Sequence, residues 1–585
     1  MTKKKKNIDF EILKRVLKLA KPHKWLLYSS LFFSIALAIL GPFRPVLVQQ
    51  AIDDAIQKYD YNGLVLMSLV IVAVIILESI FRYLFIYISR TLGQAVVKDL
   101  RVKVFSHIIK LKLSYFDKTP IGTSTTRTVN DIETINSIFT QGFIQIIADV
   151  STIFFLLFFM FWKSPLLALV SISTLPLLLY VSYIFKEKVK GTFQVVRTKV
   201  SELNAFLQEH ITGMKIVQIF GVEKQEFEKY TKINQEHTDA NVNTIWYYSL
   251  FFPAVEILLS IAIGFMVWMG ASFILKETPG VTEGLIISFI LWINMLFRPI
   301  RFLAERFNTL QMGLVAAERV FKLIDEPNAM KNEGSVKDLD IKGKIEFKNV
   351  SFSYTEEKQV LHDISFEIKE GETLAIVGST GSGKSTIINI LSRLYNINKG
   401  EILLDDINID DYDIEFLRKQ ICTVLQDVFL FSGTIEDNIR LLDKAISSEK
   451  IKKTAELIGA NEFIESLPNA YKYEVMERGA TLSLGQRQLI SFVRALVQEP
   501  TILVLDEATS SVDTETEQII QKAIDKMVED RTSIIIAHRL STIQNADKIM
   551  VLNNGTIVEY GKREDLLEMN GIFKELYENQ FLLSQ

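Results

Sequence analysis

Long apolar stretches before about residue 310 constrain this chain more than any other feature of its sequence. A helix that crosses a bilayer needs about 20 mostly apolar residues. Parts such as 64–77 and 153–161 are apolar on every face, which disfavours the alternative of buried helices in a large soluble protein. We therefore predict six membrane-spanning helices, at roughly 25–48, 63–88, 138–162, 166–185, 247–275 and 285–303.

The joints between these spans differ in length and indicate an orientation. Those after the first, third and fifth spans are short, whereas those near 89–137 and 186–246 are long, charged and helical in periodicity. The second to fifth helices should therefore extend well beyond the bilayer on one side. Lys and Arg are concentrated in residues 1–24, on that same side. The positive-inside rule then predicts a multi-pass protein of the cytoplasmic (inner) membrane, with the N-terminus, the long joints and the C-terminal domain in the cytoplasm.

The region before the first span has its own pattern. Between residues 8 and 20, apolar positions recur at helical spacing, with Lys14, Arg15 and Lys18 between them. This pattern favours an interfacial helix on the inner leaflet over a solvated basic tail. We assign residues 1–24 to this element and 25–325 to the membrane domain.

Some polar residues lie inside the predicted spans, where a central charge costs about 3 kcal/mol. Glu78 and Arg82 are four residues apart and could pair on one helix face. Three explanations of these residues are open: they line a water-filled substrate cavity, they pair between helices, or the spans are shorter than the ranges given above. No substrate role is assigned to any of them. The residues concerned are Arg44, Glu78, Arg82, Asp149, Glu256, Asn294 and Arg298.

Residues 340–585 are typical of a soluble α/β domain. Hydrophobic residues make up 49% of the whole chain, but most of the excess lies before this domain. The net charge of −4 gives no basis for nucleic-acid binding. The single cysteine, Cys422, excludes an internal disulfide.

A glycine-rich segment in this domain has the pattern of a phosphate-binding loop. It follows an apolar strand predicted at 373–377 and precedes a helix, which is the context that such a loop requires. Its glycines let backbone N–H groups surround phosphates, Lys384 would reach the β- and γ-phosphates, and Ser385 would ligate Mg²⁺. The segment consists of Gly378, Ser379, Thr380, Gly381, Ser382, Gly383, Lys384, Ser385 and Thr386.

Two further segments indicate which reaction the phosphate-binding loop serves. An apolar strand at 501–505 ends in Asp506 and Glu507. Asp506 suits a second Mg²⁺ contact, and Glu507 suits a group that polarises the attacking water. Upstream, Leu-Ser-Leu-Gly-Gln-Arg-Gln at 482–488 opens a helix that Ser483 could cap, so a second helix N-terminus could face a phosphate.

With these motifs in this order, nearly the whole chain resembles the ATP-binding cassette family, and most closely its bacterial multidrug and lipid exporter half-transporters. The resemblance implies that Tyr354 stacks on adenine, that Gln426 links Mg²⁺ and the water to the membrane domain, and that His538 contacts the γ-phosphate. It implies an ATP-contacting signature at Ser483, Gly485 and Gln486, an interface loop at 510–513 that includes Asp513, and an exporter-type segment at 474–479.

The signature departs from the family pattern at one position. Leu484 stands where a glycine is expected, and leucine resists a backbone with φ > 0. Altered signatures in this family sometimes mark one chain of a heterodimer, but Glu507 is intact, and a homodimer is favoured.

The resemblance implies a six-helix membrane domain fused to a P-loop ATPase that uses ATP and Mg²⁺ to export a hydrophobic or lipid-like substrate. Partners would be a second half-transporter chain and membrane lipid, with no nucleic acid. Segments 126–132 and 220–226 would transmit closure, the latter on the partner cassette. The alternatives are an ATP-gated channel or regulatory receptor, a soluble ABC ATPase, which the spans disfavour, and an importer, whose membrane subunits are usually separate chains.

Overall fold

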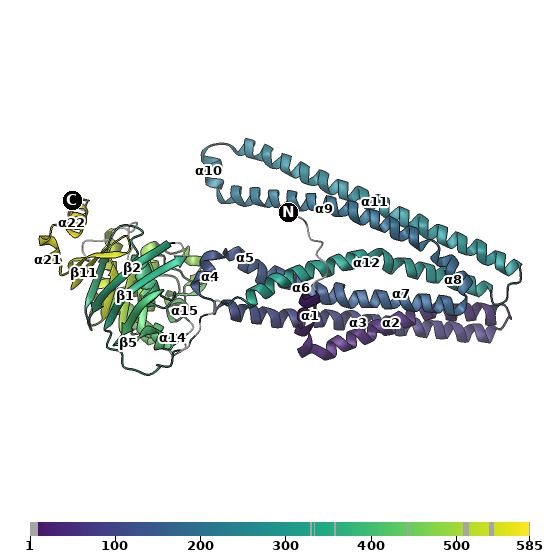
Figure 1. Ribbon diagram of the computed structural model, residues 1–585, viewed down its shortest axis with the longest axis horizontal. Helices are drawn as coiled ribbons and strands as arrows, with labels where there is room; N and C mark the ends of the chain where they lie inside the picture. The colour runs from purple at the N-terminus through teal and green to yellow at the C-terminus, as the bar shows by residue number, and fades with distance from the viewer. Residues whose placement is uncertain are drawn as a thin grey trace. The chain divides into compact units, whose positions relative to one another are not determined.

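The chain forms two compact units (Figure 1). The computed structural model describes residues 10–327, 330, 332, 334–355, 358–441, 443, 445–506, 514–537 and 543–583. The membrane unit comprises the chain up to Ile109 and Ile121–Pro327. The cassette unit comprises Lys110–Pro120 and the chain after Pro327.

The membrane unit contains six helical segments that are long and apolar enough to cross a bilayer, which confirms the six predicted spans. In the described part of the chain they are Lys21–Ile56, Tyr61–Ile108, Ile121–Lys163, Pro165–Thr212, Glu223–Leu275 and Glu283–Ile324. The fifth has 53 residues. At 1.5 Å per residue it is about 80 Å long, whereas a bilayer core is about 30 Å thick. The predicted helical extensions are therefore present.

These segments include short breaks and changes of helix type. The π-helical turns η3 and η4 interrupt the third segment, and a break between α8 and α9 divides the fourth. The elements are α1 (Phe10–Leu19), η1 (Lys21–His23), α2 (Lys24–Gln50), η2 (Ala51–Ile56), α3 (Tyr61–Ile108), α5 (Ile121–Thr126), η3 (Arg127–Asp131), α6 (Ile132–Ser137), η4 (Ile138–Gly142), α7 (Phe143–Lys163), α8 (Pro165–Ile172), α9 (Leu175–Thr212), α10 (Met214–Ile219), α11 (Glu223–Leu275) and α12 (Glu283–Ile324).

Two helix groups make up the membrane unit. Helices α2, α3, α7 and α12 pack together, while α9 and α11 run side by side and are joined through α10 (Figure 1). Trp292 of α12 is fully buried and donates its indole N–H to the Pro42 carbonyl at 2.8 Å. Ser288 donates to the Pro45 carbonyl at 2.5 Å. These bonds fix α12 against α2 at the two prolines.

The polar residues of the first spans form ion pairs. Glu78 is buried and accepts from Arg82 at 2.6 Å, which confirms the predicted pairing four residues apart. Arg44 of α2 reaches the same carboxylate at 3.5 Å. Asp149 of α7 lies 3.5 Å from Arg306 of α12. Pairing within and between helices therefore accounts for Arg44, Glu78, Arg82 and Asp149.

The N-terminal helix α1 is held against the end of α12. Its residues Leu13 and Val16 are buried. Arg15 donates two hydrogen bonds of 2.5 Å to Asp325, and its guanidinium lies 4.1 Å from the centre of the Phe321 ring. A solvated tail is therefore the wrong interpretation of Phe10–Leu19, while its position in the lipid interface stays a prediction.

The cassette unit is built on three sheets. A four-stranded antiparallel sheet has the order β2-β1-β4-β5, a six-stranded sheet has the order β12-β11-β3-β10-β9-β6, and β7 pairs with β8. In the six-stranded sheet, β11, β3, β10, β9 and β6 are parallel and β12 is antiparallel. The strands are β1 (Ile345–Thr355), β2 (Lys358–Ile368), β3 (Thr373–Val377), β4 (Lys399–Leu404), β5 (Ile407–Asn408), β6 (Ile421–Val424), β7 (Gly433–Thr434), β8 (Glu474–Val475), β9 (Ile502–Asp506), β10 (Thr532–Ile536), β11 (Lys548–Asn553) and β12 (Thr556–Gly561).

Helices surround these sheets and bury two large apolar clusters. One cluster joins β3 and the following helix to the antiparallel sheet, and the other lies under α18 and α19. The helices are α4 (Leu113–Lys118), α13 (Lys384–Leu391), η5 (Ile409–Asp411), α14 (Ile414–Gln420), α15 (Ile435–Arg440), α16 (Ser448–Leu457), α17 (Asn461–Ser466), η6 (Ala470–Lys472), η7 (Glu477–Gly479), α18 (Leu484–Leu496), α19 (Thr514–Val528), α21 (Arg563–Glu568) and α22 (Ile572–Leu583).

The long joint after the second span contains a segment that was not predicted to belong to the cassette. Residues Lys110–Pro120, which include α4, are part of the cassette unit. They lie between the end of α3 at Ile108 and a new helical run that begins at Ile121. The predicted contact segment 126–132 belongs to the membrane unit, where Asp131 is buried and lies 3.6 Å from Arg319 of α12. Its role in transmitting closure stays a prediction.

Candidate functional site

The glycine-rich loop lies between β3 and α13, at the carboxyl end of a central parallel strand. Gly383 has φ +108°, and a Cβ there would lie 2.7 Å from a Leu361 methyl carbon. Glycine is therefore required for both backbone conformation and space. Lys384 is buried, and its ammonium donates to the carbonyls of Gly378 at 2.8 Å and Ser379 at 2.9 Å. The loop thus closes around the lysine that was predicted to reach phosphates.

The environment of Lys384 is partly desolvated. Burial lowers the pKa of its ammonium, and the nearby Asp506 carboxylate opposes that shift. Asp506 ends β9, which β10 separates from β3 in the sheet. Carboxyl ends of parallel strands meet at one sheet edge, so the topology brings loop and carboxylate together.

The predicted Mg²⁺ ligands Ser385 and Asp506 are adjacent. The Ser385 hydroxyl donates to Asp506 Oδ2 at 3.3 Å. Both groups offer hard oxygen atoms beside a phosphate loop, which is the donor set that Mg²⁺ prefers when phosphate completes its coordination. The residues present therefore fit this ion.

The predicted adenine-stacking residue, Tyr354, lies at the end of β1. Its side chain is partly accessible, since the residue is 37% exposed. Its hydroxyl shares a 3.1 Å hydrogen bond with Thr386 and accepts from Asn389 at 3.2 Å. Both partners are on α13, so Tyr354 is attached to the helix that follows the phosphate loop.

Gln426 follows β6 and is exposed. Val424 and Leu425, directly before it, line a small cavity of about 20 Å³ together with Asp506 and Gln488. The Gln426 loop therefore borders the Asp506 end of the site.

The signature segment forms the start of α18. The Ser483 hydroxyl accepts from the Gln486 N–H at 3.2 Å, and the Ser483 N–H donates to Gln486 Oε1 at 3.0 Å, which completes a capping box. Leu484 is the first helical residue and is not among the residues with positive φ. The expected conflict between leucine and φ > 0 is therefore absent. Gly485 is buried beneath this turn.

Several predicted site residues lie outside the described part of the chain. These are Glu507, Ser510, Asp513 and His538. The described strands β9 and β10 that precede them are parallel neighbours, with Asp506 opposite Ile536. Their roles stay predictions.

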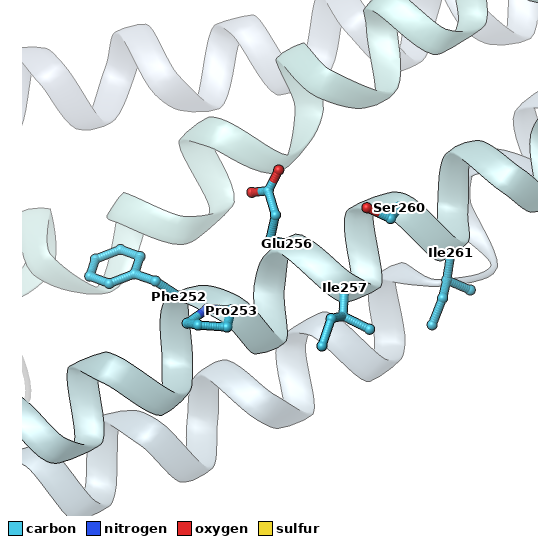
Figure 2. A pocket seen from close by; sticks show the side chains of 6 residues that line it. All are labelled: Phe252, Pro253, Glu256, Ile257, Ser260 and Ile261. Atoms are coloured by element: carbon cyan, nitrogen blue, oxygen red, sulfur yellow. The ribbon is translucent and has the colours of Figure 1, made fainter.

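The membrane unit has an open hollow of about 770 Å³ on α11 (Figure 2). Glu256 and Ser260 project from one side of the helix, and Ile257 and Ile261 from the other. In the described residues, Glu256 has no ion-pair partner, in contrast to Glu78. The lining residues are Phe252, Pro253, Glu256, Ile257, Ser260 and Ile261.

The sequence interpretation missed two contributors near the site, Tyr395 and Asp117. Tyr395 packs on Tyr354, and its hydroxyl donates to Asp117 of α4. The available signal was the apolar and aromatic stretch at 113–116 inside a charged joint, which indicates a buried contact.

Comparison with known proteins agrees with this architecture. The family described as the ABC transporter transmembrane region matches residues 27–300, and the ABC transporter family matches residues 361–510. Relatives include a probable multidrug resistance ABC transporter ATP-binding/permease protein, YheH, of Bacillus subtilis (strain 168). It is 36% identical and is aligned over 89% of this chain and 77% of its own.

Two further relatives are aligned over nearly their whole length. The ATP-dependent lipid A-core flippase of Syntrophus aciditrophicus (strain SB) is 34% identical over 98% of this chain and 95% of its own. A putative multidrug export ATP-binding/permease protein, YgaD, of Bacillus subtilis (strain 168) is 34% identical over 98% and 100%. The chain is therefore a multi-pass membrane protein of the ABC transporter family, with its membrane region and its ATP-binding, ATP-hydrolysing cassette fused in one polypeptide.

Proposed function

We propose that this protein is an exporter half-transporter that uses ATP binding and hydrolysis to move a hydrophobic or amphipathic molecule outward across the cytoplasmic membrane. The observation that carries this proposal is the fusion of six long apolar helices to a cassette whose phosphate-loop lysine, Ser385 and Asp506 lie together. The multidrug and lipid A-core names of its relatives support this substrate class.

Each ATP would be shared by two cassettes. One chain would supply Tyr354, the phosphate loop and Asp506, with Ser385, Asp506 and Gln426 on Mg²⁺. Bound Mg²⁺ would neutralise the charge that develops on the transferred phosphate. We assign the polarisation of the attacking water to Glu507 and contact with the γ-phosphate to His538. The second chain would supply Ser483, Gly485, Gln486 and the loop that includes Asp513.

We propose that the second chain is another copy of this one. The helical backbone at Leu484 supports this proposal, because its N–H can point along the helix axis as a glycine's would. The tip of α10 suits docking on the partner cassette, since Ile216, Ile219 and Phe220 are exposed there. Native mass measurement of the purified chain with ATP should give a dimer, and a monomer without ATPase activity would instead require a different partner.

The hollow on α11 supports a substrate that is amphipathic and positively charged. Glu256 lies among mostly apolar side chains and has no ion-pair partner in the described part of the chain. Such a carboxylate in a membrane-spanning helix is costly unless a ligand or water compensates it. In lipid nanodiscs, we expect Glu256→Gln to reduce ATPase stimulation by a quaternary ammonium amphipath relative to its neutral analogue. Glu228→Gln is the matched control, because Glu228 is exposed on the same helix outside the hollow. Equal loss for both compounds would contradict the charge assignment.

Transport against a gradient distinguishes an exporter from a channel. In inverted vesicles, wild-type protein should accumulate the quaternary ammonium probe in an ATP-dependent manner. Glu507→Gln should retain ATP binding and lose both hydrolysis and accumulation. Equilibration without accumulation would instead identify an ATP-gated channel.

A further inference from the structure

A chain of contacts joins the phosphate-loop helix to α4 inside the cassette unit. The Tyr354 hydroxyl is bound to Thr386 and Asn389 of α13. The rings of Tyr354 and Tyr395 meet edge to face, with centroids 5.0 Å apart and planes at 89°. The Tyr395 hydroxyl in turn donates to the Asp117 carboxylate of α4. Three successive contacts thus connect the helix after the phosphate loop to a segment inserted between two membrane-unit helices.

The Tyr395 ring is fixed on more than one side. It also meets Phe352 of β1 edge to face, with centroids 5.8 Å apart, and Phe352 itself packs on Tyr354 at 4.8 Å. Edge-to-face geometry constrains both the distance and the relative orientation of the rings. A reorientation of Tyr354 would therefore disturb its packing on both Phe352 and Tyr395.

Non-covalent contacts hold both ends of the α4 segment in the cassette unit. Leu111 and Tyr115 are buried, and the Lys110 carbonyl accepts from the Met330 N–H at 2.7 Å. Asp117 lies at the other end of the segment, where Tyr395 holds it. The Tyr395 bond is thus placed to determine whether this end of α4 stays against the cassette.

The Tyr395 hydroxyl is suited to act as a permanent donor. Burial raises the pKa of this phenol well above its usual value, and the Asp117 carboxylate raises it further. The hydroxyl therefore keeps its proton throughout the physiological range, and the contact does not depend on pH there.

We propose that Tyr395 is a positioning residue that couples adenine stacking on Tyr354 to the docking of α4. This inference rests on the proposed adenine role of Tyr354. When adenine stacks on Tyr354, the ring orientation is fixed, and Tyr395 is held where its hydroxyl meets Asp117. Coupling between two binding events is reciprocal, so docked α4 should equally favour adenine binding.

The test compares a nucleotide with a probe that lacks a base. Affinities of the full-length protein in nanodiscs are measured by titration with Mg–ATP and with Mg–tripolyphosphate. Tyr395→Phe keeps the ring and removes only the hydroxyl. We expect it to weaken ATP binding about fivefold, the equivalent of one ordinary hydrogen bond, and to leave tripolyphosphate binding unchanged. A merely structural role would weaken both, and an unchanged ATP affinity would also overturn the proposal.

Variants of Asp117 provide a conservative substitution that should keep the hydrogen bond, and a double-mutant cycle with Tyr395. Asp117→Asn keeps a carbonyl acceptor and should retain wild-type ATP affinity, whereas Asp117→Leu should reproduce Tyr395→Phe. The double variant Tyr395→Phe/Asp117→Leu should be no weaker than either single variant, because both remove the same bond. Additive losses would overturn the proposal.

Two further variants distinguish a failure of the proposed coupling from a failure of the adenine assignment. Tyr560→Phe is the matched control, because the Tyr560 hydroxyl donates to the Glu367 carbonyl elsewhere in the cassette, and it should change neither affinity. Tyr354→Ala tests the adenine role itself. If it weakens ATP but not tripolyphosphate while Tyr395→Phe does neither, only the coupling is wrong. If Tyr354→Ala has no selective effect, the adenine assignment and this inference fail together.

Discussion

Ser483 has one role in the structure and a second that we propose, and two substitutions separate them. In the structure, its hydroxyl accepts from the Gln486 N–H and caps α18, whose inner face lies in the apolar cluster under α18 and α19. In the proposed dimer, the same hydroxyl faces the γ-phosphate bound by the other chain. Ser483→Ala removes both functions, whereas Ser483→Asp keeps a capping oxygen and adds a negative charge.

The expected magnitudes differ for the two variants. Loss of a serine cap costs about 1 kcal/mol, which for a domain of this size lowers Tm by about 2–4 °C. An aspartate caps a helix as well as serine, so Ser483→Asp should unfold near the wild-type temperature. Its carboxylate about 4 Å from a phosphate oxygen would cost about 4 kcal/mol at an effective dielectric of about 20, which corresponds to about a thousandfold weaker closure on ATP.

The assays are thermal unfolding without nucleotide and steady-state ATP hydrolysis in nanodiscs. We expect Ser483→Ala to lose stability and part of its turnover, and Ser483→Asp to keep stability and lose turnover. Wild-type hydrolysis by Ser483→Asp would refute the phosphate contact. An unchanged Tm in Ser483→Ala would refute the energetic role of the capping box.

Two further predictions concern the cassette. Lys384→Ala should weaken Mg–ATP binding at least about tenfold, because the variant loses a positive charge and leaves two loop carbonyls without their donor; unchanged affinity by titration would contradict the phosphate-loop assignment. The Phe416 N–H, then Asn332 and Lys337, hold the pKa of Asp413 below its usual value. Its ionised form therefore stabilises the fold above the unfolded pKa of about 3.9, and this contribution is lost as pH falls through the lower folded pKa. Asp413→Asn should show a shallower acid transition in unfolding followed by circular dichroism, and an identical transition would exclude this linkage.

The features that could be predicted from the sequence are formed by residues that lie close together along the chain. The phosphate loop at 378–386 could be predicted because glycine, lysine and serine must follow one another there. Glu78 and Arg82 could be paired because helix geometry places residues four apart on one face. The six spans could be predicted because lipid demands continuous apolar length.

Other features depend on tertiary contacts between distant residues. Tyr395 and Asp117 are separated by 278 positions, and the local sequence around one gives no indication that it contacts the other. At Leu484 two expectations conflicted, because the family pattern suggested φ > 0 and the predicted Ser483 cap implied a helical start; the capping box of Ser483 and Gln486 shows that the second was right. The membership of Lys110–Pro120 in the cassette unit could not be predicted, because it depends on contacts with residues far along the chain, such as the bond from the Met330 N–H to the Lys110 carbonyl.

The assignment of Lys110–Pro120 to the cassette unit has a mechanical consequence. The polypeptide passes between the two units three times, after Ile109, after Pro120 and after Pro327. Three covalent crossings limit the relative motion of two bodies more than a single linker would. Cleavage at a protease site placed after Pro120 would leave the crossings after Ile109 and after Pro327 intact, and the end of α4 near Asp117 would then be held only by its contacts with the cassette, such as the Tyr395 bond.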